Sequence, residues 1–200
     1  MATGRIISRG ETPASRANIA NLIAIARILL APVFIALLLM DDGELGTLRY
    51  AAAILFVVAI ASDALDGHLA RSRNLITDLG KLLDPIADKL LIGSALVCLS
   101  ILGELWWWVT ILILARELGI TVYRFFALRD RVIAATWSGK FKTIAQAIAT
   151  SLMLFPLWLV LGDWYRWAGW VAMGIALALT LYSGADFFYK AWRLRRGEQR

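Results

Sequence analysis

Long apolar segments recur along almost the whole chain, and this pattern limits the fold more than any other feature of the sequence. A helix needs about 20 consecutive apolar residues to cross the hydrocarbon core of a bilayer. Of the 200 residues, 60% are hydrophobic, and no polar stretch is long enough for a separate soluble domain. The sequence therefore predicts an all-α integral membrane protein with six transmembrane helices, at residues 20–40, 48–71, 82–102, 106–127, 139–161 and 167–189.

The predicted helices form one membrane domain, residues 18–190, with a polar segment on each side. Residues 1–17 carry three arginines and do not have the pattern of a signal peptide. They are compatible with a short N-terminal surface helix or with a frayed tail. Residues 191–200 are expected to form a basic cytoplasmic tail.

Basic residues are divided unevenly between the two sides of the predicted bundle. Arginine and lysine fill both termini and follow the second and fourth apolar segments, whereas the remaining loops are acidic apart from Arg49 and Arg166. Because cytoplasmic loops are enriched in basic residues, we expect both termini on the cytoplasmic side of the cell membrane. The formal net charge of +6 is explained in the same way, so no nucleic-acid partner is expected.

Aromatic residues gather at the opposite interface. Tryptophan and tyrosine prefer the level of the lipid headgroups, where one part of the ring system is apolar and another is hydrated. We expect an aromatic belt of Trp106, Trp107, Trp108, Trp164, Tyr165, Trp167 and Trp170.

Four aspartates lie where the second and third apolar segments meet the cytoplasmic side. Asp63 and Asp66 are three residues apart and Asp84 and Asp88 are four apart, so each pair shares one helix face. If the two faces meet, four carboxylates converge in a medium of low dielectric constant and require cations. Mg²⁺ or Mn²⁺ suits oxygen ligands and phosphate chemistry. The alternative is that these aspartates cap helices or pair with neighbouring arginine and lysine residues.

Glycine and arginine near the aspartates suit a phosphate-containing ligand. Gly67 leaves no side chain beside the proposed metals, so a bulky ligand can approach the backbone. Arg71 follows one helical turn later, where its guanidinium group can bind a pyrophosphate. Gly80 opens the start of the next segment, although an ordinary loop glycine explains it equally well.

Read together, residues 63–88 give the pattern D-x2-D-G-x2-A-R-x8-G-x3-D-x3-D. This pattern resembles the signature of the CDP-alcohol phosphatidyltransferase family. The resemblance implies a six-helix fold in the lipid bilayer, a homodimer, and a site for two metal ions that opens to the cytoplasm.

The resemblance also implies roles for individual residues. Asp63 and Asp84 would bridge the two metals, and Asp66 would be a further ligand of one of them. Asp88 would bind the other metal and act as the catalytic base. The expected contacts to the donor, CDP-diacylglycerol, are Asn21, Arg27, Gly67, Arg71, Thr77 and Gly80.

A second group of charged residues lies in the fourth and fifth apolar segments. Arg116 and Glu117 are on the order of 15 Å of helix from the outer tryptophans, hence near mid-membrane. Taken singly, these residues are explained as a structural ion pair or as snorkelling lysines. Taken together, they predict a second basic pocket and an acceptor that is itself a phosphate ester. The expected acceptor-phosphate contacts are Arg116, Arg124, Lys140, Lys142 and Gln146.

The same region resembles the branch of the family that uses sn-glycerol 3-phosphate as the acceptor. The resemblance is carried by Ala115-Arg116-Glu117, by Arg124 and by the run 137–146. Residues 18–32 resemble the opening of that branch, with alanine at positions 20 and 24 where proline and threonine are usual. The resemblance implies transfer of the phosphatidyl group from CDP-diacylglycerol to glycerol 3-phosphate, with release of CMP.

Other functions remain open on the sequence. An enzyme of the same fold that used inositol phosphate or phosphatidylglycerol would carry the same residues 63–88. A membrane cation transporter would also place carboxylates within the membrane, but no matching acidic set lies on the far side and no internal repeat is present. A non-catalytic assembly subunit would hold metals without needing Asp88.

Overall fold

The computed structural model describes the backbone of residues 19–72, 78–127 and 137–195, and the side chains of residues 25–62, 89–123, 139 and 141–193. Every regular element in these ranges is a helix, as the sequence predicts. The helices are α1 (Ile19–Met40), α2 (Thr47–Ser72), α3 (Asp78–Ile101), α4 (Trp107–Ala127), α5 (Trp137–Leu154), α6 (Trp158–Leu161) and α7 (Asp163–Arg195).

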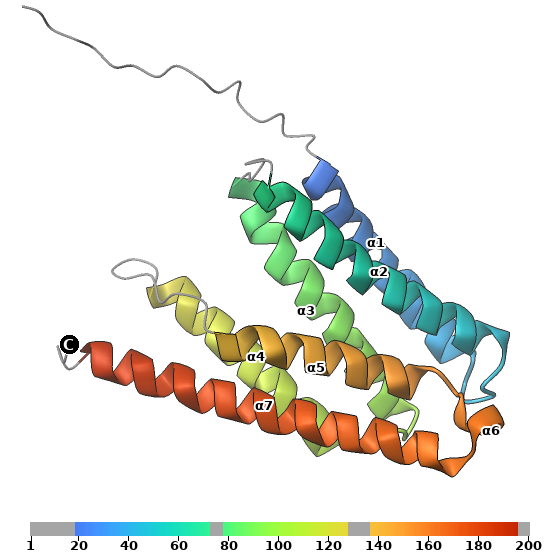
Figure 1. The fold of residues 1–200 in the computed structure, drawn as a ribbon. Coiled ribbons are helices and arrows are strands. Elements are labelled where there is room, and N and C mark those ends of the chain that lie inside the picture. Colours follow the sequence, from blue (N-terminus) through green and yellow to red (C-terminus); the bar gives the residue numbers. More distant parts are fainter. Residues whose placement is uncertain (1–18, 73–77, 128–136, 196–200) are drawn as a thin grey trace, which may run out of the picture.

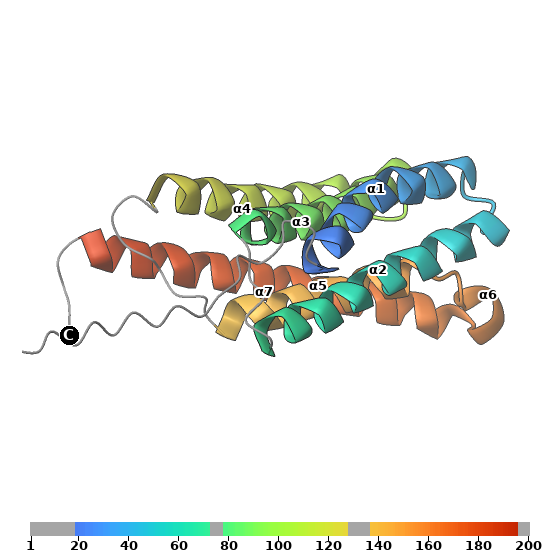
Figure 2. The ribbon, with the colours of Figure 1, turned by 90° about the horizontal axis from the view of Figure 1, so that it is seen from above.

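The long helices pack in two layers. Figure 2 shows α1, α3 and α4 in one layer and α2, α5 and α7 in the other. Within the layers, α3 packs against α1 and α4, and α5 packs against α2 and α7; between them, α1 meets α2, α3 meets α5, and α4 meets α7. The apolar core includes Phe34, Phe56, Leu96, Leu99 and Leu154, all fully buried.

Successive long helices run in opposite directions, so their ends gather at two ends of the bundle (Figure 1). One end, which we call the tryptophan end, contains the connections 41–46, 102–106 and 155–162. At the other, the basic end, α2, α4 and α7 finish and α1, α3 and α5 begin. Toward the basic end, α1, α2 and α3 spread away from α4, α5 and α7 (Figure 1).

The observed helices match the first four predicted ranges to within about one helical turn. The fifth prediction is wrong at its C-terminal end, because α5 stops at Leu154 rather than continuing to residue 161. Pro156 lacks an N–H group and disfavours helical geometry at the preceding residue, so the helix breaks there. Gly162 then adopts a φ of 88°, which separates the short α6 from α7. The last helix is therefore longer than the predicted range 167–189.

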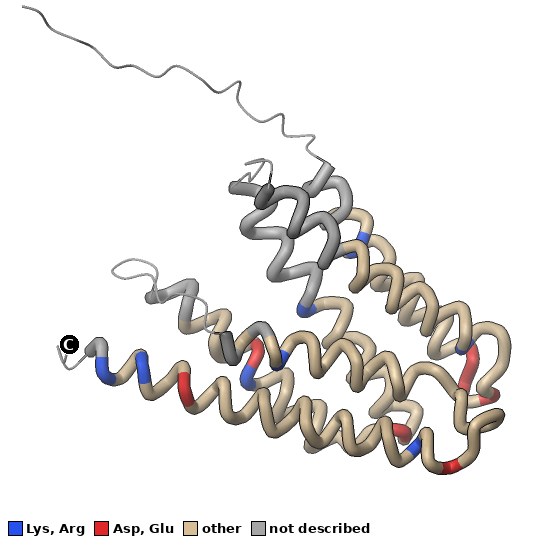
Figure 3. The backbone as a smooth tube through the Cα atoms, in the orientation of Figure 1, with Lys and Arg blue, Asp and Glu red and all other residues tan. Residues whose placement is uncertain are grey.

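The surface between the two ends is apolar. Leu29, Ile54, Val58, Ile148 and Val171 are each more than half exposed. Figure 3 shows long uncharged stretches along the helices, with many of the described charged residues toward the two ends, whereas Arg116 and Glu117 lie halfway along α4. Soluble monomers rarely expose an apolar surface of this extent.

One helix in the described part of the chain, Asp163–Arg193, is long and apolar enough to cross a membrane. Shorter apolar helical stretches within that part are Ile25–Met40, Thr47–Ser62, Lys89–Ile101 and Phe141–Leu154. The part of the chain that the structure describes is therefore all-helical and contains one helix able to span a membrane by its length and composition.

A buried arginine joins three segments at the tryptophan end. Arg49, near the start of α2, is 0% exposed. Its Nε donates to the carbonyl oxygen of Leu154 at 2.8 Å, and its Nη2 donates to that of Met153 at 3.1 Å. These are the last carbonyl groups of α5, and they accept no hydrogen bond from within the helix. A cation is therefore favourable beside them. Nη2 also forms an ion pair with Glu104, in the connection between α3 and α4.

The turn before α2 is fixed by Asp41. Its Oδ1 accepts hydrogen bonds from the backbone N–H groups of Gly46 (3.0 Å) and Arg49 (3.1 Å), and its Oδ2 accepts one from Leu45 (3.0 Å). Leu45 has a φ of 56°, an unfavourable value for a residue with a side chain, and the carboxylate holds the turn in this shape. We refer to Asp41, Arg49 and Glu104 as the Arg49 cluster.

We predict that Arg49→Met lowers the free energy of unfolding in detergent by about 3–5 kcal/mol, the usual loss when one partner of a buried ion pair is removed. Burial raises the pKa of the Glu104 carboxyl, and the Arg49 guanidinium opposes this rise. In the variant the pKa of Glu104 should rise further. A raised folded-state pKa contributes stability that is lost as the pH rises, so the deficit of the variant should shrink as the pH falls through that pKa.

Thermal unfolding from pH 4 to pH 8 measures this effect. Arg166→Met is the matched control, because Arg166 is an exposed arginine at the same end, 5.4 Å from the centre of the Trp158 ring. The role given to the Arg49–Glu104 pair would be contradicted if both variants lost the same stability. It would also be contradicted if the loss of stability in Arg49→Met did not change with pH.

Candidate functional site

The helix ends that carry the predicted donor site lie together at the basic end. α2 finishes at Ser72 and α3 begins at Asp78, so the segments that contain positions 63–72 and 78–88 approach the same end of the bundle (Figure 1). The side chains of Asp63, Asp66, Asp84 and Asp88 lie outside the residues that the structure describes. Among the described side chains there is no group of three or more histidine, cysteine, aspartate or glutamate residues able to hold a metal.

The described polar side chains near this end centre on Glu117 of α4. Its Oε1 accepts a hydrogen bond from Arg116 Nη1 at 2.9 Å and also forms an ion pair with Lys142 Nζ from α5. Lys142 is buried, and Arg116 and Glu117 are mostly buried. A lysine and an arginine therefore share one carboxylate oxygen inside the bundle. We call Arg116, Glu117 and Lys142 the Glu117 cluster.

The Glu117 cluster continues to α7 through hydroxyl groups. Arg116 Nη2 donates to Ser183 Oγ at 2.9 Å, and Ser183 Oγ donates to the carbonyl oxygen of Thr180 at 3.1 Å. Gln146, one turn after Lys142 on α5, donates through Nε2 to Thr180 Oγ1 at 2.8 Å. The same turn of α7 therefore accepts hydrogen bonds from a residue of α4 and from a residue of α5.

A further link reaches α3. Lys89 Nζ donates a hydrogen bond to Thr121 Oγ1, and Thr121 Oγ1 donates to the carbonyl oxygen of Glu117 at 2.7 Å. Lys89 directly follows Asp88 in the sequence. The hydrogen-bonded network therefore extends from the Glu117 cluster to the residue next to the predicted catalytic aspartate.

The Glu117 cluster carries more positive than negative charge. Within the cluster, Arg116 and Lys142 supply two cationic side chains and Glu117 supplies one carboxylate, which leaves an excess of one positive charge among these three residues. The buried Nε of Arg116 has no hydrogen-bond acceptor in the described structure. Buried positive charge in excess of its counter-ions is stabilised by an anionic ligand, and phosphate oxygens match both ammonium and guanidinium groups.

The predicted acceptor residues are partly brought together. Arg116, Lys142 and Gln146 belong to one network, whereas the side chains of Arg124 and Lys140 lie outside the described residues. The phosphate-binding roles of all five stay predictions.

The predicted donor contacts are described less completely. Arg27 is buried on α1, with 2% of its surface exposed. The remaining predicted contacts lie outside the side chains that the structure describes: Asn21, Gly67, Arg71, Thr77 and Gly80.

Sequence reasoning missed the contribution of α7. Thr180 and Ser183 lie three residues apart in an otherwise apolar segment, with Gly184 directly after them. This spacing puts two hydroxyl groups on one helix face and could have indicated a polar contact. Nothing in the sequence indicates that this face meets Arg116 and Gln146.

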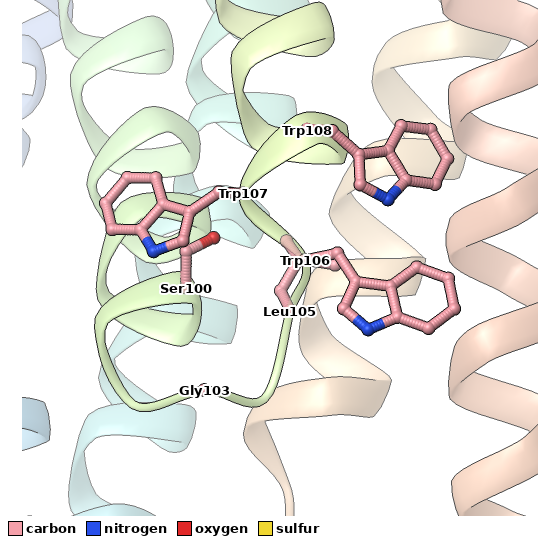
Figure 4. Close-up of a pocket in the computed structure, with 6 residues that line it drawn as sticks. All are labelled: Ser100, Gly103, Leu105, Trp106, Trp107 and Trp108. Atoms are coloured by element: carbon pink, nitrogen blue, oxygen red, sulfur yellow. The ribbon is translucent and has the colours of Figure 1, made fainter.

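A pocket of ≈ 580 Å³ lies at the tryptophan end, away from the Glu117 cluster (Figure 4). It is lined by Ser100, Gly103, Leu105, Trp106, Trp107 and Trp108, and none of these side chains is ionisable. Trp107 lies beside Ser100, whereas Trp106 and Trp108 lie on the opposite side of the connection (Figure 4). The exposed indole rings fit the predicted aromatic belt, and the pocket has no charged group to bind a phosphate.

Comparison with known proteins identifies a family and several relatives with related names. A family profile described as "CDP-alcohol phosphatidyltransferase" matches residues 17–182. A protein of Mycobacterium tuberculosis named "Probable phosphatidylglycerophosphate synthase" is 44% identical over 191 residues, which cover 96% of this chain and 88% of that protein.

Two relatives with another name cover similar lengths. Proteins named "CDP-diacylglycerol--glycerol-3-phosphate 3-phosphatidyltransferase" from Bacillus subtilis and Escherichia coli are 38% and 34% identical to this chain. The alignments cover 88% and 87% of this chain, and 95% and 94% of the respective relatives.

We predict that Glu117 and Lys142 are energetically coupled. In a double-mutant cycle, Glu117→Gln leaves Lys142 without its carboxylate, and Lys142→Met leaves Glu117 with Arg116 as its one remaining cation in the cluster, whereas the double variant removes both charges of the Glu117–Lys142 pair. The unfolding free energies in detergent should therefore be non-additive by about 1–3 kcal/mol.

The exposed pair Asp186–Lys190, 2.7 Å apart on α7, provides the control cycle. Asp186→Asn and Lys190→Met should couple by less than about 1 kcal/mol, as is usual for exposed ion pairs. Additive losses at Glu117 and Lys142 would show that the two side chains do not act as a pair.

Proposed function

The chain belongs to the CDP-alcohol phosphatidyltransferase family, and on that basis we propose that it transfers the phosphatidyl group of CDP-diacylglycerol to sn-glycerol 3-phosphate. The products are phosphatidylglycerophosphate and CMP, and the enzyme is a CDP-diacylglycerol–glycerol-3-phosphate 3-phosphatidyltransferase of phospholipid biosynthesis. The names of the relatives support this choice of acceptor.

The structural observation that supports the acceptor best is the shared carboxylate of the Glu117 cluster. Arg116 and Lys142 converge on one oxygen of Glu117, so two cations share one carboxylate. Glycerol 3-phosphate brings a phosphate with more than one negative charge, which would offset the excess positive charge. An uncharged alcohol acceptor would leave that excess without a counter-ion inside the bundle.

Members of this family depend on a divalent metal, and the chain has suitable ligands for one. We assign Asp63, Asp66, Asp84 and Asp88 as the ligands of two Mg²⁺ ions, with Mn²⁺ as an alternative, because hard divalent cations prefer carboxylate oxygens. When bound, such ions offset the charge of the donor's pyrophosphate and of the departing CMP.

The chain's own residues would perform the remaining steps. Gly67 and Arg71 bind the CDP part of the donor, with Asn21, Arg27, Thr77 and Gly80 as further contacts. Arg116 and Lys142 hold the acceptor phosphate, and Arg124, Lys140 and Gln146 extend that pocket.

The proposed chemistry is a direct displacement. Asp88 accepts the proton of the acceptor hydroxyl, whose oxygen then bonds to the phosphorus that carries diacylglycerol. The bond from that phosphorus to the oxygen of CMP breaks, and CMP leaves with the electron pair of that bond. The transfer needs no covalent enzyme intermediate.

We further propose that α1 to α5 and α7 cross the bilayer as six spans within a domain of residues 18–190. The apolar surface between the bundle ends supports this arrangement. The excess of basic residues at the basic end favours a cytoplasmic location for that end, for the site and for both termini. A homodimer follows from the family resemblance.

We predict that the purified protein, supplied with CDP-diacylglycerol and Mg²⁺, releases CMP with glycerol 3-phosphate and not with inositol 1-phosphate or phosphatidylglycerol. EDTA should abolish the release and added Mg²⁺ should restore it. Asp88→Asn should lower kcat by about 10²–10⁴-fold, the usual range for loss of a general base. The measurement is CMP formed per minute in detergent or nanodiscs.

Asp186→Asn is the matched control, because this aspartate pairs with Lys190 on α7 outside the Glu117 cluster. It should leave kcat unchanged. Release with another acceptor would keep the family and refute glycerol 3-phosphate as the acceptor. Absence of release from folded protein that binds the donor would refute the enzymatic assignment.

A further inference from the structure

The α7 helix presents a small polar site to Arg116. Ser183 and Gly184 lie next to each other on α7, and both are buried. Ser183 Oγ accepts a hydrogen bond from Arg116 Nη2 at 2.9 Å. A Cβ atom added at Gly184 would lie 3.2 Å from Arg116 Cγ and 3.6 Å from its Nε, so the arginine side chain runs directly over this glycine.

These two contacts act on different parts of the same side chain. The missing side chain at Gly184 lets the stem of Arg116 lie against α7, and the Ser183 hydroxyl holds the guanidinium group at its end. On the other side, Nη1 donates to Glu117 Oε1 at 2.9 Å. Because a guanidinium group is planar and its five N–H groups point in fixed directions, contacts to two of its nitrogens fix the orientation of the others.

The same region of α7 also restrains the helix that carries the second cation. Thr180 Oγ1 accepts a hydrogen bond from Gln146 Nε2 at 2.8 Å and donates one to the carbonyl oxygen of Ala176 at 2.6 Å. Gln146 lies one turn from Lys142 on α5. A displacement of α7 would therefore move both Arg116 and the part of α5 that bears Lys142.

We propose that Ser183 and Gly184 are positioning residues for substrate recognition: they hold Arg116 in the orientation that binds the phosphate of the acceptor. This inference rests on the proposed function, and it adds α7 to a pocket that the sequence places on α4 and α5 alone. Ser183 and Gly184 act through Arg116. They determine how tightly the acceptor phosphate is bound and leave the donor site unaffected.

Substitutions on α7 test the proposal by steady-state CMP release. Ser183→Ala should raise KM for glycerol 3-phosphate about tenfold, the usual effect of losing a hydrogen bond to a charged group. Gly184→Ala should raise the same KM because its new methyl group displaces Arg116. KM for CDP-diacylglycerol and kcat at saturating acceptor should stay within about twofold of the wild type.

Gly174→Ala is the matched control, because this glycine lies on the same helix and nothing is within 4 Å of a Cβ atom added there. The alanine changes helix propensity in the same way at both positions, so only the contact with Arg116 differs. Gly174→Ala should leave both KM values unchanged. Ser183→Thr, which keeps the hydroxyl group, should recover most of the affinity lost in Ser183→Ala.

A cycle with Arg116→Ala separates positioning from general stability. If Ser183 acts through Arg116, adding Ser183→Ala to Arg116→Ala should lower kcat/KM for glycerol 3-phosphate by less than about twofold, against about tenfold in the wild-type background. Equal effects in both backgrounds, or a parallel rise in KM for CDP-diacylglycerol, would overturn the proposal.

The activity of the wild-type protein distinguishes a failure of the proposed function from a failure of the positioning role. CMP release by the wild type with glycerol 3-phosphate supports the proposed function whatever the variants do. If the wild type is active but Ser183→Ala and Gly184→Ala show the same KM for glycerol 3-phosphate as the wild type, the positioning role is refuted and the proposed function stands. If the wild type uses a different acceptor, the proposed function itself is refuted.

Discussion

A charged side chain enclosed by apolar helices is stable only when an opposite charge or polar partner lies within reach, and this requirement organises both ends of the bundle. At the tryptophan end, Arg49 is fully buried and pairs with Glu104 and with the last carbonyl groups of α5. Toward the basic end, Glu117 is satisfied by Arg116 and Lys142. Each cluster adds ion pairs and hydrogen bonds between helices that also pack through the apolar core.

The two clusters differ in their charge balance. This difference suits the Arg49 cluster to stabilising the fold and the Glu117 cluster to binding a substrate. In the Arg49 cluster, the guanidinium group of one arginine contacts one carboxylate, that of Glu104, and two helix-terminal carbonyl oxygens, so its charge is matched by a carboxylate within the bundle. In the Glu117 cluster, two cations, Arg116 and Lys142, share the one carboxylate of Glu117. The helices are joined tightly at the tryptophan end and spread at the basic end (Figure 1), where a phosphate-bearing substrate can complete the balance.

Most of the fold is predictable from the sequence, because long apolar helices are read from residue type alone. The helical ranges 20–40, 48–71, 82–102 and 106–127 agree with α1 to α4 to within about one turn. The end of α5 was missed because apolar character continues through residues 155–161, while the break depends on the backbone of Pro156. In the site, Arg116, Lys142 and Gln146 were identifiable since charged and polar groups are costly in an apolar segment. Ser183 and Gly184 were not, because small residues are common in such helices.

The sequence by itself determined which residues are chemically unusual: four aspartates at helical spacing, a family signature over residues 63–88, and cations within apolar segments. It could do so because the cost of burying charge and the periodicity of a helix are local properties. Only the tertiary structure decided which of these residues meet. The pairing of Arg116 and Lys142 on one oxygen of Glu117, and the contact of Arg116 with Ser183, depend on how α4, α5 and α7 pack against one another. That packing is set by the fit of many apolar side chains at once, and no single segment of the chain contains it.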